Sequence, residues 1–155
     1  MIEQVDQLLV DLDRQVEKVA ECQDFVTSLS LTQSELKRKL AEAQNWAELA
    51  VIKELGGYQE NEPYSTINEK ALGSNAETRA RTMTLELARA RDPQPEIDRY
   101  WELKTKLQSV ESDLAYQQDE LRKQQDMLGA TKWKLRVYLA DKLADTEISR
   151  EVLPF

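Results

Sequence analysis

Arginines gather between residues 79 and 99 of an otherwise acidic protein: Arg79, Arg81, Arg89, Arg91 and Arg99. A guanidinium group is planar and binds phosphates or carboxylates through paired hydrogen bonds. The cluster therefore fits three alternatives. It contacts nucleic-acid phosphates, it forms a solvated helix face, or it pairs with the acidic first turns of helix 1 in a neighbouring subunit. Arg79, Arg81, Arg89 and Arg91 are the candidate nucleic-acid contacts.

A second basic segment, Lys132-Trp133-Lys134-Leu135-Arg136-Val137-Tyr138, alternates cations with aromatic residues. Such a pattern can stack single-stranded bases while neutralising the backbone. At helical spacing the same aromatic residues also serve ordinary packing. Lys132, Trp133 and Arg136 are therefore further candidate nucleic-acid contacts, with packing as the alternative.

The residues that most often perform catalysis or bind metals are scarce. Histidine is absent, which removes the commonest general base and zinc ligand. The single cysteine, Cys22, excludes an intrachain disulfide and a two-cysteine metal site. Carboxylates are abundant, but a catalytic pair needs a concave, desolvated pocket that a two-helix seam does not offer. We expect no enzymatic activity, cofactor, metal or small-molecule substrate.

The 155 residues carry a formal net charge of −8. An acidic surface repels phosphate backbones, so only a local basic patch could bind nucleic acid. No apolar run approaches the roughly 18–20 residues that span a bilayer, and the N-terminal residues do not resemble a signal peptide. The sequence predicts a soluble, cytoplasmic protein without membrane contact.

Leucines recur every seven residues over 93–144, which predicts one long coiled-coil helix. The seam is Tyr100, Leu107, Leu114, Leu121, Leu128 and Leu135, with Leu103, Val110, Gln117, Gln124, Thr131 and Tyr138 at the companion positions. The two mid-seam glutamines are interpreted as a polar layer that fixes register. A polar ligand pocket inside a bundle is the alternative.

Residues 2–55 predict a second long helix. Its apolar positions are Ile2, Val5, Leu9, Leu12, Val16 and Val19, followed by Cys22, Val26 and Leu29. This choice places Leu9, Leu12 and Val16 in the seam. Two successive steps of three around Cys22 then resemble a stammer. Thr32 with Glu35 forms a capping signature, so the helix is either continuous with a kink, which we favour, or restarts near Thr32.

The remaining segments complete a single elongated helical domain. We expect a loop at 56–73 that could include a short hairpin, a helix at 74–91 that begins with a capping box, and a tail at 145–155. Two long helices joined this way predict an all-α fold, a long antiparallel helical hairpin or coiled coil with a short middle helix. Apolar residues outside the seam predict a homo-oligomeric bundle.

The chain ends in Glu151-Val152-Leu153-Pro154-Phe155. This end resembles the C-terminal tip of bacterial single-stranded-DNA-binding proteins, in which acidic residues precede Ile-Pro-Phe. The resemblance implies that Leu153, Pro154 and Phe155 bind a partner protein. Arg150 and Val152 depart from the pattern, since acids are expected there. A tail that folds onto its own bundle is the alternative.

Asn75-Ala76-Glu77-x-Arg79, the Asp92-Pro93 break and the long leucine-spaced helix together resemble small coiled-coil proteins of phages and prophages. Those proteins tend to accompany single-strand annealing and recombination functions. The resemblance covers roughly residues 74–144. It implies an accessory role in phage DNA recombination or in countering host defence.

Two functional hypotheses follow. The first is a non-enzymatic, oligomeric accessory protein of a phage or mobile element that binds recombination or replication proteins, or DNA. The second is an acidic adaptor or inhibitor that acts by protein–protein interaction alone. Its binding surface is the acidic first half of helix 1: Glu3, Asp6, Asp11, Asp13, Glu17, Glu21 and Asp24.

Overall fold

The computed structural model describes residues 2–61, 64–89 and 91–145. The chain divides into two compact units. We call residues 1–31 with 112–155 the stem unit, and residues 32–111 the head unit. Each unit is described by itself.

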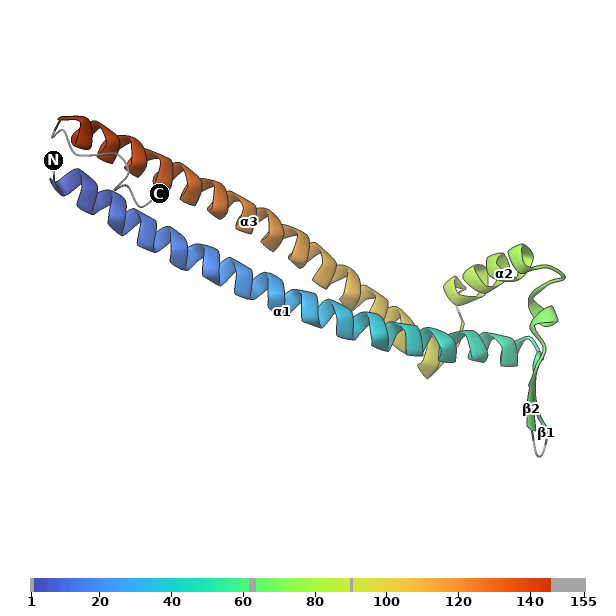
Figure 1. Cartoon of the computed structure of the whole chain (residues 1–155). Helices are drawn as coiled ribbons and strands as arrows, with labels where there is room; N and C mark the ends of the chain where they lie inside the picture. The colour runs from blue at the N-terminus through green and yellow to red at the C-terminus, as the bar shows by residue number, and fades with distance from the viewer. Residues whose placement is uncertain (1, 62–63, 90, 146–155) are drawn as a thin grey trace. The chain divides into compact units, whose positions relative to one another are not determined.

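The protein is all-α, with two long antiparallel helices and a short middle helix, as predicted (Figure 1). The elements are α1 (Ile2–Glu54), β1 (Tyr58–Asn61), β2 (Tyr64–Ile67), η1 (Glu69–Leu72), α2 (Ala76–Ala88) and α3 (Pro95–Asp145). Within the described residues, no helix is both long and apolar enough to cross a membrane.

α1 continues through Thr32 and ends at a pair of glycines. Gly56 has a φ of +80°, which glycine adopts without strain. Its amide donates to the Lys53 carbonyl (3.1 Å), and the Gly57 amide donates to the Ile52 carbonyl (2.8 Å). These two bonds form a Schellman motif, which satisfies carbonyls that the last turn of α1 leaves without partners.

The segment 56–73, expected to be a loop that could include a short hairpin, contains regular structure. β1 and β2 pair as an antiparallel hairpin, and η1 follows as one turn of 3₁₀ helix. The Asn68 amide donates to the Gly57 carbonyl at 2.6 Å, which ties the end of the hairpin to the end of α1. A Cβ at Gly57 would lie 2.6 Å from the Asn68 carbonyl oxygen, so only glycine permits this approach.

α2 begins at Ala76 because Asn75 caps it: the Asn75 side chain accepts a hydrogen bond from the Thr78 amide at 2.8 Å. The helix ends at Ala88, three residues before the predicted end at Arg91. α3 begins at Pro95, not Pro93. Proline suits a first helical position because it has no amide hydrogen to leave without a partner.

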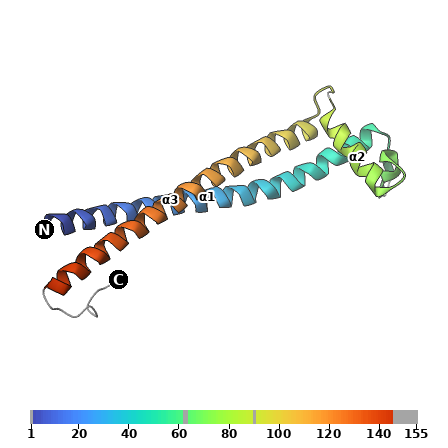
Figure 2. The ribbon, with the colours of Figure 1, turned by 90° about the horizontal axis from the view of Figure 1, so that it is seen from above.

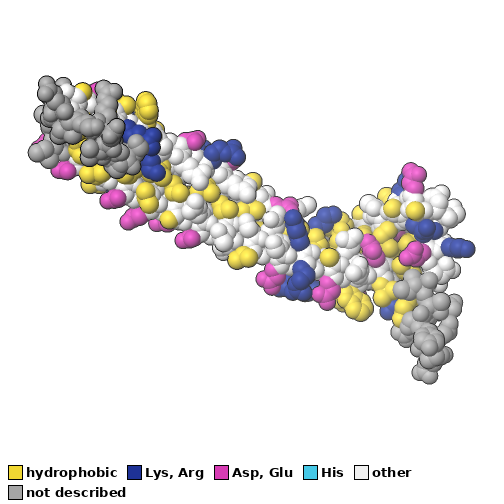
Figure 3. Space-filling view, in the orientation of Figure 1, with side chains coloured by type: hydrophobic (Ala, Val, Ile, Leu, Met, Phe, Trp, Pro, Cys, Tyr) yellow, Lys and Arg dark blue, Asp and Glu magenta, His cyan; other side chains and the backbone are white. Residues whose placement is uncertain are grey.

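The seam of the stem unit follows the predicted leucines on α3. Leu114 and Leu135 are buried, and Leu121 and Leu128 are half-buried. In Figures 1 and 2 the N-terminal end of α1 and the C-terminal end of α3 lie at the same end of this unit. On the face seen in Figure 3, hydrophobic side chains lie along the line between the two helices.

The predicted seam of α1 is wrong at two of its three residues. Leu9 and Val16 are 43% and 48% exposed, whereas Leu12 is half-buried as expected. The half-buried positions in this part of α1 are Val5, Leu8, Asp11, Leu12, Gln15, Val19, Cys22, Val26, Leu29 and Ser30. All but Asp11 and Ser30 follow a spacing that alternates between three and four, so no stammer is needed at Cys22. Gln15 occupies the seam position that hydrophobicity alone would assign to Val16.

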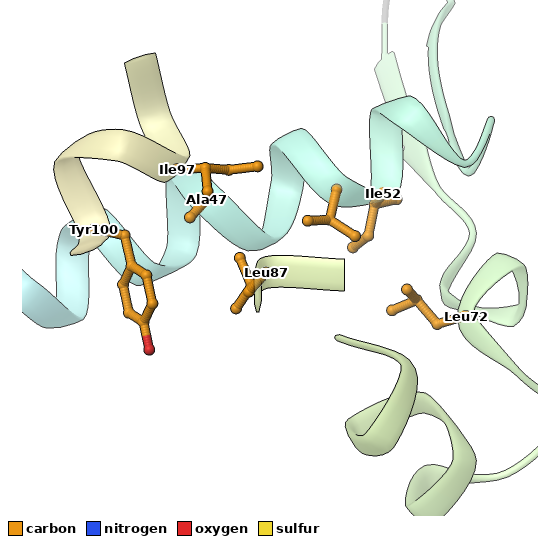
Figure 4. Packing of buried hydrophobic residues seen from close by; sticks show 7 residues of the cluster. Ala47, Ile52, Leu72, Leu87, Ile97 and Tyr100 are labelled. Carbon is orange, nitrogen blue, oxygen red and sulfur yellow. The ribbon is translucent and has the colours of Figure 1, made fainter. Parts of the chain in front are cut away.

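The head unit holds the main core. Ala47, Val51 and Ile52 from α1, Leu72 from η1, Leu87 from α2, and Ile97 and Tyr100 from α3 are buried together (Figure 4). Leu103 and Leu107 on α3 are also buried. The short elements therefore pack on the paired helix ends, and this packing shapes the surface described next.

Candidate functional site

The predicted arginine cluster is dispersed, and Arg91 is not available to a ligand. Its side chain is only 9% exposed. It pairs with the carboxylates of Glu54 on α1 and Glu86 on α2, and it also donates to the Glu86 backbone carbonyl. A buried guanidinium needs such partners to offset the loss of hydration. Arg91 therefore connects the ends of two helices, and its assignment as a nucleic-acid contact is wrong.

Arg89 belongs to the same ion cluster. Its side chain is 55% exposed, and it pairs with Glu54 at 2.9 Å and with Glu86 at 3.7 Å. Gln94 also donates to Glu54, at 3.5 Å. Two arginines thus face two carboxylates, and the local charges balance. Arg89 lies at the surface, but a phosphate would have to compete with these carboxylates for it.

The other arginines lie elsewhere in the head unit. Arg81 is exposed on α2 and pairs with Glu77 one turn earlier, at 3.6 Å. Arg99 lines a groove of about 320 Å³ beside Trp46. Arg79 lines a different and larger groove. The sequence cluster does not form one basic surface in the described structure.

The larger of these two grooves has a volume of about 480 Å³. Four elements line it, and the core residues Ile52, Leu72, Leu87 and Tyr100 contribute to it. Its other lining residues are Gln44, Glu48, Glu69, Arg79, Ala80, Met83, Thr84, Trp101 and Lys104. We call this surface the head groove. It combines apolar side chains with two acidic and two basic ones.

An aromatic pair stiffens one wall of the head groove. The rings of Tyr100 and Trp101 meet edge to face with centroids 5.2 Å apart. The Trp101 indole donates to the Leu87 carbonyl at 2.9 Å, which fixes the ring against the end of α2. The Lys104 ammonium lies 5.0 Å from the Trp101 ring centroid, within cation–π range. This wall is therefore a positioned aromatic surface with a cation at its edge.

The basic segment of α3 lies in the stem unit. Lys132, Trp133 and Arg136 are all exposed, and Trp133 is 64% exposed. Trp133 is thus not a seam residue, and its exposure fits either base stacking or a protein contact.

The acidic half of α1 is largely accessible. Six of its seven carboxylates are exposed, Asp11 being the half-buried one. In the part of the chain that the structure describes, none of the seven forms an ion pair. Leu153, Pro154 and Phe155 lie outside the described residues.

The head groove escaped prediction from the sequence because its lining comes from four elements spread over residues 44–104. The sequence of α2 does contain a signal of a packing surface. Ala80, Met83 and Leu87 form an apolar stripe along this helix, and the sequence prediction includes no partner for that stripe. Among the described residues, no group of three or more acidic, cysteine or histidine side chains is placed to hold a metal ion.

Comparison with known proteins adds no relative: no family model matches the chain, and no curated protein or solved structure is significantly similar to it. The function must therefore be argued from the surfaces themselves.

Proposed function

We propose that the protein is a non-enzymatic coiled-coil accessory protein that acts by binding a partner protein in the head groove. The observation that carries this proposal is the groove itself. It joins a positioned aromatic wall, formed by Tyr100 and Trp101, to charged side chains of both signs. Protein-binding sites commonly combine an aromatic or aliphatic anchor with a polar rim.

The connection between the long helices also supports a binding role for the head. About 40 residues separate α1 from α3, although two antiparallel helices can be joined by fewer than ten. These residues fold into a hairpin, a 3₁₀ turn and a helix with a shared core.

The charges of the groove favour a protein over a nucleic acid. Glu48 and Glu69 would repel phosphates, while Arg79 and Lys104 would attract them. A protein segment with an apolar side chain between an acidic and a basic residue matches both pairs. Placement of that partner in phage recombination rests on the sequence resemblances.

A second candidate is single-stranded nucleic-acid binding at Lys132, Trp133 and Arg136. The exposed Trp133 ring between cations is the observation that favours it. Fluorescence anisotropy with a labelled oligonucleotide at low salt tests it. The expected result is binding that Trp133→Ala weakens. Equal affinity of the wild type and this variant, or no binding at all, would exclude the site.

Affinity purification from an extract of the source cells tests the head groove. Lys104→Glu and Arg79→Glu change the groove. Lys106→Glu and Arg81→Glu change the same charge on the same two helices outside its lining. We expect one or more proteins that bind the wild type and both control variants but neither groove variant. An identical set of proteins for all five baits would overturn the proposal.

A Glu17→Lys/Glu21→Lys bait in the same experiment tests the acidic surface of α1. Selective loss of a protein from this bait alone would place the partner on α1 and not in the head groove.

A further inference from the structure

The helix pair of the stem unit has two long sides of opposite character. In a heptad lettered a to g, positions a and d form the seam, and positions e and g flank it. When two helices run antiparallel, their e positions border one side of the seam and their g positions border the other. On the seam that the structure shows, Leu12 and Leu121 are a positions. The two sides can therefore be compared residue by residue.

The e side is almost uncharged. Its e positions are Leu9, Val16, Gln23 and Ser30 on α1. On α3 they are Gln118, Gln125, Lys132 and Leu139. Lys132 is thus the single charge among these eight residues. We call this side of the helix pair the open face.

Seam residues also remain partly accessible along the open face. The a positions that border it include Val5, Leu12, Val19, Leu121 and Leu128, all half-buried and all apolar. Leu9 and Val16 beside them are 43% and 48% exposed. The sequence thus supplies a second apolar stripe, which the pairing of α1 with α3 leaves uncovered. Extended apolar surface of this kind marks an interface.

The g side differs in charge. Six of its nine positions are charged in the stem unit: Asp11, Lys18, Asp113, Glu120, Lys134 and Asp141. The d positions that border it include the polar residues Gln15, Gln117 and Gln124. Two of the other three positions, Phe25 and Met127, are exposed apolar residues, so the two sides differ in charge and not in apolar exposure.

We infer that the open face packs against the open face of a second copy of this chain, with α1 of one copy against α3 of the other. The argument for this partner is charge complementarity at the rim. The rim of the open face on α1 is formed by b positions, which lie next to the e positions on the side away from the seam. Asp6 and Asp13 are b positions, beside Leu9 and Val16. Lys132 and Arg136 lie at the rim on α3, at the same end of the stem unit (Figure 1).

A two-fold axis parallel to the helices brings the acidic rim of each copy to the basic rim of the other, and does so twice. Every neighbouring pair of helices is then antiparallel, which is a common four-helix bundle arrangement. The other symmetric contact, α1 against α1, would run the two copies of α1 antiparallel and would not bring the acidic rim of one copy to the basic rim of the other. A face four heptads long and two helices wide is roughly 40 Å by 20 Å, or about 800 Å² per copy, which is the size of a standard stable interface.

This inference concerns the stem unit and goes beyond the proposed function of the head groove. The test is the mass of the full-length protein in solution by sedimentation velocity. We expect twice the 17.9 kDa of one chain. Asp6→Lys/Asp13→Lys and Lys132→Glu/Arg136→Glu should each raise the dimer dissociation constant roughly 100-fold, because each opposes like charges at every rim contact.

An equimolar mixture of these two variants should restore the dimer as a heterodimer, since acidic then meets basic at both rims. Glu17→Lys/Glu21→Lys is the matched control. It makes the same charge change on the same helix, away from the open face, and should remain dimeric. Circular dichroism at 222 nm checks that each variant is helical.

Several results would overturn the inference. One is a wild-type protein that stays monomeric at about 100 µM, a concentration at which even a weak but specific dimer would form. If residues 1–145 alone dimerise while the full chain does not, the C-terminal tail covers the open face in place of a second copy. If the wild type is a dimer that neither charge variant weakens, another surface forms it. If Lys132→Glu/Arg136→Glu abolishes oligonucleotide binding but leaves the dimer intact, the α3 rim serves nucleic acid. In each case the purification with groove variants still reports on the head groove separately.

Discussion

Replacement of Arg91 by Met tests the conclusion that this arginine is structural. The side chain is 9% exposed and bonds to Glu54 and Glu86, including the Glu86 backbone carbonyl. Met keeps the aliphatic contacts but removes every hydrogen bond. A hydrogen bond to a charged group contributes about 1.5–3 kcal/mol, but the two carboxylates are 28% and 19% exposed and recover some hydration. We expect a loss of about 3 kcal/mol in the free energy of unfolding.

Urea denaturation followed by circular dichroism at 222 nm measures this loss. Arg81→Met is the matched control, because Arg81 is 73% exposed and makes one pair along the same helix. A pair of that kind contributes about 0.3–0.5 kcal/mol. The two variants should therefore differ by about 2.5 kcal/mol at an unchanged m-value. Equal denaturation midpoints for both variants would refute the buried ion cluster. If Arg91→Met lost oligonucleotide binding without losing stability, Arg91 would again be a candidate nucleic-acid contact.

Three further predictions use the same denaturation assay. Gly57→Ala should destabilise the protein by about 2 kcal/mol, because the added Cβ would lie 2.6 Å from a backbone oxygen. Gly129→Ala should stabilise it by about 1 kcal/mol, because no atom lies within 4 Å of the added Cβ. The opposite order of stability would contradict the turn geometry at Gly57. Gln124→Leu should raise stability by about 1 kcal/mol, since Oε1 of Gln124 is buried without a partner in the described structure; a lower midpoint would show that the amide is satisfied. Asn75→Ala should cost about 1 kcal/mol through loss of the cap on α2, and an unchanged midpoint would argue against that cap.

The long helices could be predicted from the sequence because their signal is local and repeated. On α3 a single register collects six of the eight leucines, so the heptad identifies the seam without knowledge of the partner. On α1 two registers compete, one through Leu9 and Val16 and the other through Leu8 and Gln15. Hydrophobicity favours the first, and the structure has the second. Both stripes are genuine features of the sequence, and only packing against α3 decides which one becomes the intrachain seam.

The candidate sites were harder to predict because they depend on distant residues. Nothing near Arg91 in the sequence indicates that Glu54, 37 positions away, is its partner. The cluster of arginines therefore suggests one basic surface, although two of its members pair with Glu54 at the end of α1 and Glu86 on α2. The head groove likewise needs the fold, since Glu48 and Lys104 approach it from separate helices. The glycine pair that ends α1 was recognisable, but the hairpin beyond it has no strong periodic signal.

The distance between α1 and α3 is the most direct test of the antiparallel helix pair on which every surface described above depends. Gln33 Nε2 and Glu111 Oε1 lie 3.5 Å apart across the two helices. The distance between nitroxide labels at these two positions, in a chain with Cys22 replaced by Ala, can be measured by pulsed electron paramagnetic resonance. The account predicts a single narrow distance of roughly 20 Å or less, allowing for the label arms on neighbouring helices. A broad distribution centred well beyond that distance would show that the helices do not pair in this way.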